Sequence, residues 1–309
     1  MEIIGVDHGF GYVKTKTAIF AAGVARFENE PPFMQKTLKY NGAYYTVGGQ
    51  PDGLASGKTS NEEYYVLTLA AIAEELKNRK MPVANVHLAA GLPLTTFGKE
   101  KSEFEQYLLQ DKRQVISFEY EMKKYQIRIE KVSLYPQGYA AIAPMLSSIN
   151  GSCYIVDIGT GTTDILFIGS DKIPDMKRAR TIPQHGISTC ISAVNEQISR
   201  EFGVEFASQE IIDMIRGKDV VTNKKAKEVC NSAISDFAAV TLDILRQNKV
   251  NYMLTPTYII GGGATLLEKH VGNLKIDDTC IKYLQDIRLN AIGYEMLAEC
   301  SSKKEDVSA

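Results

Sequence analysis

The chain has 309 residues, of which 44% are hydrophobic and 23% charged, and its 35 Lys and Arg against 37 Asp and Glu leave a formal net charge of −2. This composition is typical of a globular protein of roughly two domains and excludes a disordered, collagen-like or disulfide-stapled chain. The near-neutral charge does not favour direct DNA binding, and no apolar run approaches the roughly 20 residues that span a bilayer.

The sequence begins MEIIGVDHG, without the basic start of a signal peptide. Its five cysteines form no CxxC pair, and its four histidines show no spacing typical of metal ligands. Zinc is therefore not expected, and a reducing cytoplasm is the expected compartment.

The first half of the chain begins with a pattern typical of a β-hairpin. It consists of an apolar strand at residues 3–6, a glycine-rich turn at 7–11 and a return strand at 12–20. Residues 21–60 are rich in Gly and Pro and are expected to be mostly loop. The other predicted elements of this half are a helix from an Asn61 N-cap to about Lys80, a strand at 83–90, a helix at 99–109, two strands within 114–132 and a short helix at 135–146 that opens after Pro136.

The second half repeats the opening pattern after Asn150-Gly151, which is the clearest break in the chain. The repeat comprises a strand at 154–156, a turn at 157–161 and a return strand at 162–168. The elements predicted after it are helices over 187–248, broken near Gly203 and Gly217, a strand at 258–260, a closing helix from about Asn290 and a polar, fraying segment at 301–309.

Asp7 and Asp157 open the two turns, share the pattern Asp-x-Gly-x-Gly and lie 150 positions apart. This spacing predicts two similar lobes that each begin with a hairpin. Strands that alternate with helices predict an α/β fold, and the hairpins make each sheet mixed rather than purely parallel.

Both turns suit phosphate binding. Glycine lets backbone N–H groups approach phosphate oxygens without an obstructing Cβ. The glycines concerned are Gly9 and Gly11 in the first turn and Gly159 and Gly161 in the second. Asp7 and Asp157 end apolar strands, where a carboxylate is costly without a role, and two such carboxylates can hold Mg²⁺ through water. A tight hairpin explains one such turn equally well, whereas two copies at this spacing favour a shared site.

Three further features extend this candidate site. Lys14 can reach a phosphate from the return strand, although a solvated lysine fits the same position. Thr162 and Thr163 can offer a hydroxyl, and Asp164 adds a second acid, although it also fits a strand surface. The glycines at 261–263 can admit a flat purine, or can form an ordinary strand-to-helix turn.

Residues 52–59 (DGLASGKT) nearly match the P-loop pattern G-x-x-x-x-G-K-[ST]. Asp52 takes the place of the first glycine, and an acid in a phosphate cradle would repel the ligand. We therefore interpret this segment as a surface loop.

Three motifs, in their order along the chain, resemble those of the actin, heat-shock 70 and sugar kinase superfamily. They are IIGVDHGFGYVK at 3–14, similar to the first phosphate loop, YIVDIGTGTTDI at 154–165, similar to the second, and YIIGGGATLL at 258–267, similar to the adenosine motif. LYPQGYAAIAP at 134–144 and NAIGYEMLA at 290–298 occupy the places of the two interlobe helices. VHLAAGLP at 86–93 makes the resemblance closest to the plasmid-segregation actins of the ParM/StbA group.

The resemblance implies a two-lobed actin-like fold in which each lobe is a mixed sheet flanked by helices. Lobe I would comprise residues 1–150 and 290–309, with a small outer subdomain at about 21–80. Lobe II would comprise residues 151–289, with an outer subdomain at about 205–250. The chain is short for an actin, so these outer subdomains are brief.

The resemblance also implies roles for individual residues. Gln137 would orient the attacking water, and Asp157, Asp164 or the phosphate itself would accept its proton, because a glutamine amide is not a base. Asp7 and Asp157 would hold Mg²⁺, through water. The residues implied to bind the nucleotide are Asp7, Gly9, Phe10, Gly11, Lys14, Gly159, Thr160, Gly161, Thr162, Gly261, Gly262 and Gly263.

Two parts of the implied site depart from the family or match it poorly. Phe10 stands where actins often have a hydroxyl residue, so a side-chain bond to the γ-phosphate is lost. Glu196, Arg200 and Glu210 are polar candidates for contacts to the adenosine, although each is more typical of a solvated helix surface.

The implied function is an ATPase that binds ATP or GTP with Mg²⁺ and polymerises into filaments through head-to-tail contacts. The filaments would drive plasmid segregation through a DNA-binding adaptor of the ParR type, so the chain would touch plasmid DNA only indirectly and no membrane. One alternative is a small-molecule kinase with Asp164 as its base. A second is a chaperone-like switch, although 309 residues leave no room for a peptide-binding domain. A third is a cytoskeletal filament protein that is non-catalytic or does not segregate DNA.

Overall fold

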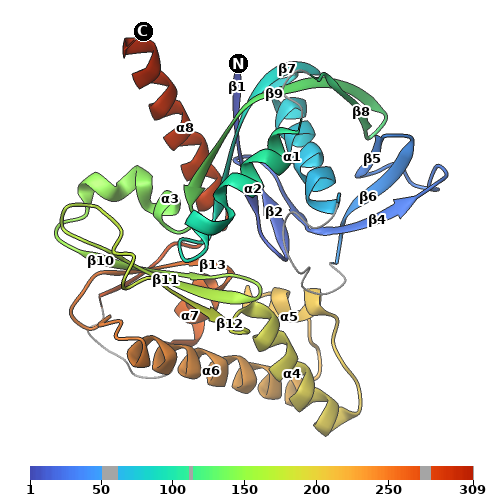
Figure 1. Cartoon of the computed structure of the whole chain (residues 1–309). Helices are drawn as coiled ribbons and strands as arrows, with labels where there is room; N and C mark the ends of the chain where they lie inside the picture. Colours follow the sequence, from blue (N-terminus) through green and yellow to red (C-terminus); the bar gives the residue numbers. More distant parts are fainter. Residues whose placement is uncertain (51–61, 111–113, 272–279, 309) are drawn as a thin grey trace. The chain divides into compact units, whose positions relative to one another are not determined.

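The computed structural model describes residues 1–50, 62–110, 114–271 and 280–308. The chain divides into two compact units, unit 1 (Met1–Ser148 and Arg288–Ala309) and unit 2 (Ile149–Ile287). Each unit is built on one mixed sheet (Figure 1). Among the described residues, none of the helices has the combination of length and hydropathy that crossing a bilayer requires.

Unit 1 contains a nine-stranded sheet in the order β3-β2-β1-β7-β9-β8-β5-β6-β4. Its strands are β1 (Glu2–His8), β2 (Tyr12–Lys14), β3 (Ile19–Ala21), β4 (Gly23–Phe27), β5 (Thr37–Tyr40), β6 (Ala43–Gly49), β7 (Val83–Leu92), β8 (Ile116–Tyr120) and β9 (Lys123–Pro136). Its helices are α1 (Glu63–Arg79), α2 (Phe97–Leu109), α3 (Tyr139–Ile142), the 3-10 helix η1 (Ala143–Ser148) and α8 (Leu289–Ser308).

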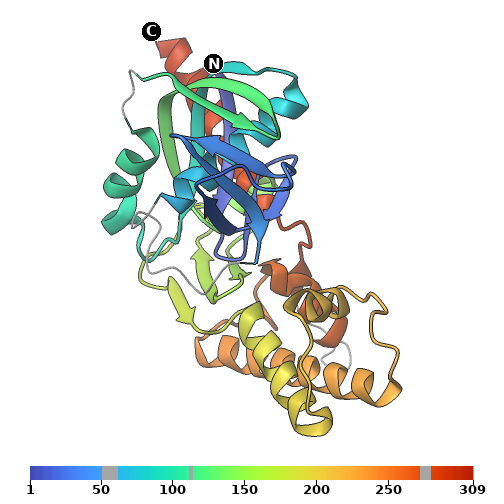
Figure 2. The ribbon, with the colours of Figure 1, turned by 90° about the vertical axis from the view of Figure 1, so that its right-hand side faces the viewer.

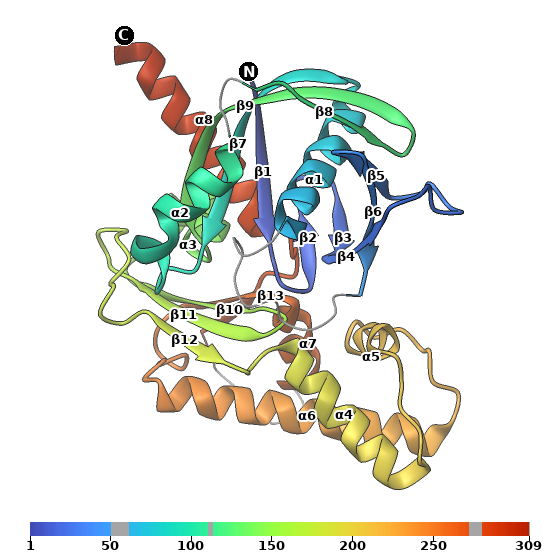
Figure 3. The same ribbon diagram turned by 45° about the vertical axis from the view of Figure 1, so that its right-hand side comes forward.

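Successive residues of β1 face opposite sides of this sheet, as strand geometry requires. Ile4 and Val6 belong to the core that includes side chains of α1 and α2, whereas Ile3 packs against a cluster that contains Tyr294 of α8. Gly5 approaches α8 so closely that a Cβ would lie 2.1 Å from the carbonyl oxygen of Ala291. Strand β1 therefore lies between α1 and α8 (Figure 3).

Unit 2 contains a five-stranded sheet in the order β12-β11-β10-β13-β14. Its elements are β10 (Cys153–Ile158), β11 (Thr162–Ile168), β12 (Arg180–Pro183), α4 (Ile187–Phe202), α5 (Ser208–Ile215), α6 (Lys224–Gln247), β13 (Thr257–Gly261), α7 (Gly262–Val271) and β14 (Ile281–Tyr283). Side chains of α4, α6 and α7 share a core with β10 and cover one face of this sheet (Figure 2). Gly203 and Gly217 follow α4 and α5 with φ of +71° and +82°, so both predicted helix breaks are confirmed.

The two sheets share a five-strand arrangement. The order β3-β2-β1-β7-β9 in unit 1 corresponds to β12-β11-β10-β13-β14 in unit 2. In each, the first two pairings are antiparallel and the last two are parallel. One predicted glycine turn joins β1 to β2, and the other joins β10 to β11. The predicted α/β fold with mixed sheets and a repeated hairpin is thus confirmed.

Four local predictions differ from the structure. The return strand expected at 12–20 is two antiparallel strands, β2 and β3. Residues 21–50, the described part of the segment expected to be rich in loops, contain β4, β5 and β6; the residues of β6 alternate between buried and partly exposed, which is the pattern of a half-buried strand. Residues 301–308 continue α8 instead of fraying, and Lys303 and Lys304 are residues that favour a helix. The helix expected at 135–146 begins only at Tyr139, because β9 continues through Pro136.

Two other predictions fall on residues outside the described ranges. These are the Asn61 N-cap and the P-loop-like segment 52–59. The helix that Asn61 was expected to start begins at Glu63.

Candidate functional site

The glycine turn between β1 and β2 is closed by its own backbone. The N–H of Gly9 donates to the carbonyl oxygen of Tyr12 across 3.1 Å. A Cβ on Gly9 would lie 2.8 Å from that oxygen and from Nζ of Lys14, so this position has no room for a side chain. Its N–H thus has an acceptor within the turn, and a contact of Gly9 with a phosphate stays a prediction. Phe10 and Gly11, at the bend, are the other candidates in this turn.

Asp7 is hydrogen-bonded to two other predicted site residues of unit 1, Lys14 and Gln137. Its carboxylate is buried; Oδ2 accepts a hydrogen bond from Nζ of Lys14 across 2.9 Å, and Oδ1 accepts one from Nε2 of Gln137 across 3.2 Å. Asp7 and Lys14 are register partners on adjacent strands. A buried carboxylate is costly without such partners, and the lysine compensates its charge. Gln137 lies in the turn between β9 and α3 rather than within a helix.

The turn between β10 and β11 repeats the same closure. The N–H of Gly159 donates to the carbonyl oxygen of Thr162 across 2.9 Å, and a contact of this glycine with a phosphate stays a prediction. Thr160 and Gly161 form the bend. The hydroxyl of Thr163 is buried and donates to the carbonyl oxygen of His185 across 2.7 Å, which leaves Thr162 as the candidate hydroxyl of this strand.

The start of α4 supports this second turn. The turn itself was predicted, but this contact with α4 was not. The N–H of Ile187 donates to the carbonyl oxygen of Gly159 across 3.0 Å, and the N–H and hydroxyl of Ser188 both donate to that of Thr160 across 2.8 Å. N–H groups in the first turn of a helix have no acceptor within the helix, so the turn supplies acceptors. A Cβ on Gly186 would lie 2.5 Å from the oxygen of Thr160. A glycine directly before a helix was the available signal.

Buried histidines attach both turns to neighbouring helices. Nε2 of His185 lies 3.0 Å from Oγ1 of Thr241 in α6, and that hydroxyl donates to the carbonyl oxygen of Phe237 across 2.8 Å. Because the only hydroxyl proton is used there, the imidazole donates from Nε2. Burial lowers the pKa of His185, which favours the neutral ring. In unit 1, Nε2 of His8 lies 2.7 Å from Oγ1 of Thr68 in α1, a similar attachment.

Asp157 and Asp164 are direct register partners on β10 and β11. Directly opposed residues point to the same face of a sheet, so the two carboxylates lie side by side. Oδ1 of Asp164 also accepts a hydrogen bond from the hydroxyl of Thr181 across 2.5 Å. Like charges in this arrangement repel, and a bound cation would relieve the repulsion. The pair therefore fits Mg²⁺, which prefers oxygen ligands and keeps part of its water shell.

The run of three glycines lies where β13 meets α7, as predicted. Gly261 has a φ of +78°, and a Cβ on it would lie 2.5 Å from Oδ1 of Asp157. A Cβ on Gly263 would lie 2.4 Å from Cβ of Ile158. Close packing of the end of β13 and the start of α7 against β10 thus explains Gly261 and Gly263. Gly262 is exposed and is the remaining candidate for contact with a ligand.

The three polar candidates for adenosine contacts have partners in their own helices or caps. Glu196 and Arg200 form an exposed i, i+4 ion pair of 2.5 Å on α4. Glu210 accepts a hydrogen bond from the N–H of Ala207 across 2.8 Å and so caps α5. These contacts fit solvated helix surfaces.

Two family models match the chain. One, described as actin like proteins N terminal domain, matches residues 5–139, and the other, described as archaeal actin homologue MreB-like, C-terminal, matches residues 155–273. An archaeal actin homolog of Thermoplasma volcanium is 27% identical over an alignment of 334 residues, which covers 97% of this chain and 100% of that protein.

Solved structures share the fold. The archaeal actin homolog Ta0583 in complex with ADP has a TM-score of 0.76 at 23% identity, covering 97% of this chain and 99% of that one. ParM in a 15-stranded filament from Clostridium botulinum has a TM-score of 0.73 at 19% identity, covering 96% and 98%. The predicted actin-like fold is confirmed. Because both kinds of protein match, membership of the ParM/StbA group in particular stays a prediction.

Proposed function

Because the chain belongs to the actin-like superfamily, we propose that it is an ATPase that assembles into filaments with bound nucleotide. The observation that carries this proposal is the repeated turn. In both units an aspartate is the penultimate residue of a strand, and a glycine N–H then closes the turn onto a carbonyl oxygen three residues later. This closure leaves the bend residues outside the strand pairing, and we propose that their backbone N–H groups bind an anion.

We assign the phosphate contacts to the bends and to the return strands. Phe10 and Gly11 act through backbone N–H groups in unit 1, as do Thr160 and Gly161 in unit 2. Lys14 adds positive charge and Thr162 a hydroxyl, and Gly262 approaches the adenosine. The ADP complex of Ta0583 supports an adenine nucleotide, and GTP is the competing ligand to test.

We propose Mg²⁺ as the metal that these carboxylates bind through water. The residues concerned are Asp157 and Asp164 in unit 2 and, in unit 1, Asp7, which accepts hydrogen bonds from Lys14 and Gln137. When bound, the ion neutralises charge on the phosphates.

Gln137 is the residue that we propose to orient the attacking water. Its amide is anchored through Asp7, and it cannot take up a proton at neutral pH. Asp157 or Asp164 therefore accepts the proton of that water. An interaction of this kind matters mainly in the transition state and contributes to turnover more than to nucleotide affinity.

Assembly is tested by light scattering and pelleting of the full chain over a range of concentrations with Mg-ATP, Mg-GTP or no nucleotide. We expect polymer only above a threshold concentration and only with Mg²⁺ and nucleotide, and phosphate release that Asp157→Ala nearly abolishes. A kinase of the same fold would bind Mg-ATP and stay soluble at every concentration. Monomers throughout would refute assembly, and wild-type phosphate release by Asp157→Ala would refute the site.

The finer proposal concerns what the filaments do. Segregation of plasmid DNA through an adaptor of the ParR type rests on the resemblance to the ParM/StbA group, and the filament of the Clostridium botulinum ParM supports self-assembly. The test is whether a purified candidate adaptor, with its DNA site, binds the polymer and not the monomer.

A further inference from the structure

Gln137 lies in a turn whose backbone is held on both sides. Its N–H donates to the carbonyl oxygen of Leu92 at the end of β7 across 2.9 Å, and its own carbonyl oxygen accepts from the N–H of Tyr139 across 2.8 Å. The next residue, Gly138, has a φ of +73°, a conformation that favours glycine. The direction of the Gln137 side chain towards Asp7 therefore depends on this turn.

The N–H of Gly138 is held by a residue 152 positions away in the sequence. It donates across 2.9 Å to Oδ1 of Asn290, in the first turn of α8, and the bond is buried. Gly138 directly precedes α3, where N–H groups lack an acceptor within the helix. A buried N–H without an acceptor is destabilising, and Asn290 provides that acceptor.

Close packing of α3 on α8 fixes the position of Asn290. A Cβ on Gly293, three residues after Asn290, would lie 1.9 Å from the carbonyl oxygen of Ala140 in α3. Ala140 and Tyr294 belong to one buried cluster. Oδ1 of Asn290 is therefore presented from a helix that packs directly against the element that follows Gln137, not from a loop.

We infer that Asn290 is a positioning residue for ATP hydrolysis. It holds the N–H of Gly138 and thereby sets the direction of the Gln137 amide. The inference rests on the proposed function, because it concerns the rate of that reaction. Since Asn290 acts through Gln137 and not on the nucleotide, its loss is expected to lower kcat and to leave KM nearly unchanged.

The experiment measures phosphate release from Mg-ATP by the full chain as wild type, Gln137→Ala, Asn290→Ala and the double variant. Asn290→Ala is expected to lower kcat about 10-fold or more, since small displacements of a catalytic group have effects of this size, with KM within about twofold of wild type. In the Gln137→Ala background the same change should alter kcat less than about twofold, because the residue that it positions is gone.

The matched control is Asn223→Ala. It also removes a side-chain oxygen that accepts from a backbone N–H at the start of a helix, here that of Ala226 in α6 at 3.0 Å, and it should keep the wild-type kcat. Asn290→Asp keeps an oxygen at the position of Oδ1 and provides the comparison if Asn290→Ala does not fold. Its kcat should stay within about threefold of wild type.

Three results would overturn the inference while leaving the proposed function in place. They are a wild-type kcat in folded Asn290→Ala, an equal fall in kcat in both backgrounds, and a loss of about 10-fold or more in an Asn290→Asp variant with the wild-type melting temperature. No phosphate release from the wild-type chain would instead refute the proposed function, and the inference with it.

Discussion

Nζ of Lys14 lies 2.9 Å from Oδ2 of Asp7, and the two side chains are 16% and 4% exposed. The pair is formed between register partners at the ends of β1 and β2, so the hairpin itself brings the charges together. The carboxylate at the first turn thus has a counterion supplied by its own hairpin.

Replacing Lys14 by Met removes this ammonium group and keeps most of the side chain. Breaking a buried ion pair from one side leaves an uncompensated charge, so we expect the free energy of unfolding to fall by about 3 kcal/mol. Urea unfolding measures it. The matched control is Lys225→Met, whose partner Glu201 and own side chain are 48% and 67% exposed, and it should leave the free energy of unfolding nearly unchanged. Equal losses in the two variants would mean that Lys14 does not stabilise Asp7.

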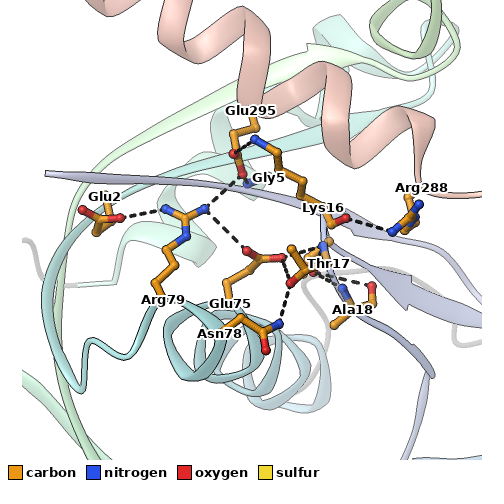
Figure 4. Close-up of polar contacts among 11 residues, drawn as sticks. Glu2, Gly5, Lys16, Thr17, Ala18, Glu75, Asn78, Arg79, Arg288 and Glu295 are labelled. Carbon is orange, nitrogen blue, oxygen red and sulfur yellow. Dashed lines mark hydrogen bonds and ion pairs between the residues drawn. The ribbon is translucent and has the colours of Figure 1, made fainter.

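Arg79 contacts three carboxylates, one each from β1, α1 and α8 (Figure 4). Its guanidinium lies 2.8 Å from Glu2, 3.5 Å from Glu75 and 3.3 Å from Glu295. Glu75 and Glu295 are 1% and 3% exposed. Hydrogen bonding to Glu295 also raises the pKa of Lys16. This cluster connects β1, α1 and α8.

Arg79→Met is expected to destabilise the chain by about 3–5 kcal/mol, since two buried carboxylates lose a shared partner. Lys16→Met removes a side chain that is 51% exposed and should cost less than about 1 kcal/mol. Both losses are measured by urea unfolding in low and high salt. If the Arg79 variant were no less stable than the Lys16 variant, the buried carboxylates would not depend on the guanidinium.

Gly293→Ala tests the packing of α8 against α3. The added Cβ would overlap the carbonyl oxygen of Ala140, so the helices must separate, and overpacking of this kind costs about 1–3 kcal/mol or more. Gly98 in α2 is the control, because a Cβ there meets nothing within 4 Å. Gly98→Ala should stabilise the chain by about 0.5–1 kcal/mol. Melting temperatures that move in the same direction would contradict this account.

Burial lowers the pKa of both His185 and His270 below the ordinary 6.5. Their neutral form is thus favoured in the folded chain, whereas the unfolded chain takes up protons once the pH falls below about 6.5. We therefore expect these two histidines to leave the free energy of unfolding independent of pH above about 6.5 and to lower it as the pH falls towards 5. His185→Gln should show a shallower decrease in urea unfolding at pH 7, 6 and 5. An unchanged slope would mean that His185 does not contribute to it.

The sequence predicts the parts of the site that are local. Both glycine turns, their aspartates and the strand-to-helix turn at Gly261 lie where the spacing places them, because a hairpin is determined by neighbouring residues. The Gly and Pro content of 21–60 concealed β6, for which the run of aromatic and β-branched residues over Tyr44–Val47 was the better signal.

Contacts between distant residues were not predictable from one sequence. The bonds from Gln137 to Asp7 and from Gly138 to Asn290 join positions 130 and 152 apart, and no local pattern encodes such pairs. Nor does the sequence show where a hydrogen-bond donor points. The N–H of Gly9 and the hydroxyl of Thr163 were assigned to a ligand, yet both donate within the protein.

The route of the chain through unit 1 has a consequence for its synthesis. Strands β1 and β7 leave the ribosome early, but α8, which covers them, follows the whole of unit 2. At about 5–20 residues per second, the wait from β9 to the end of α8 is on the order of 10–30 s. During that time the face of β1 and β7 that α8 will cover is exposed. Gly5 and Gly91 lie on this face, where a Cβ would overlap α8. Unit 2 can thus complete its core before unit 1 does. Until then, the exposed face of unit 1 can bind chaperones or pair with other nascent chains.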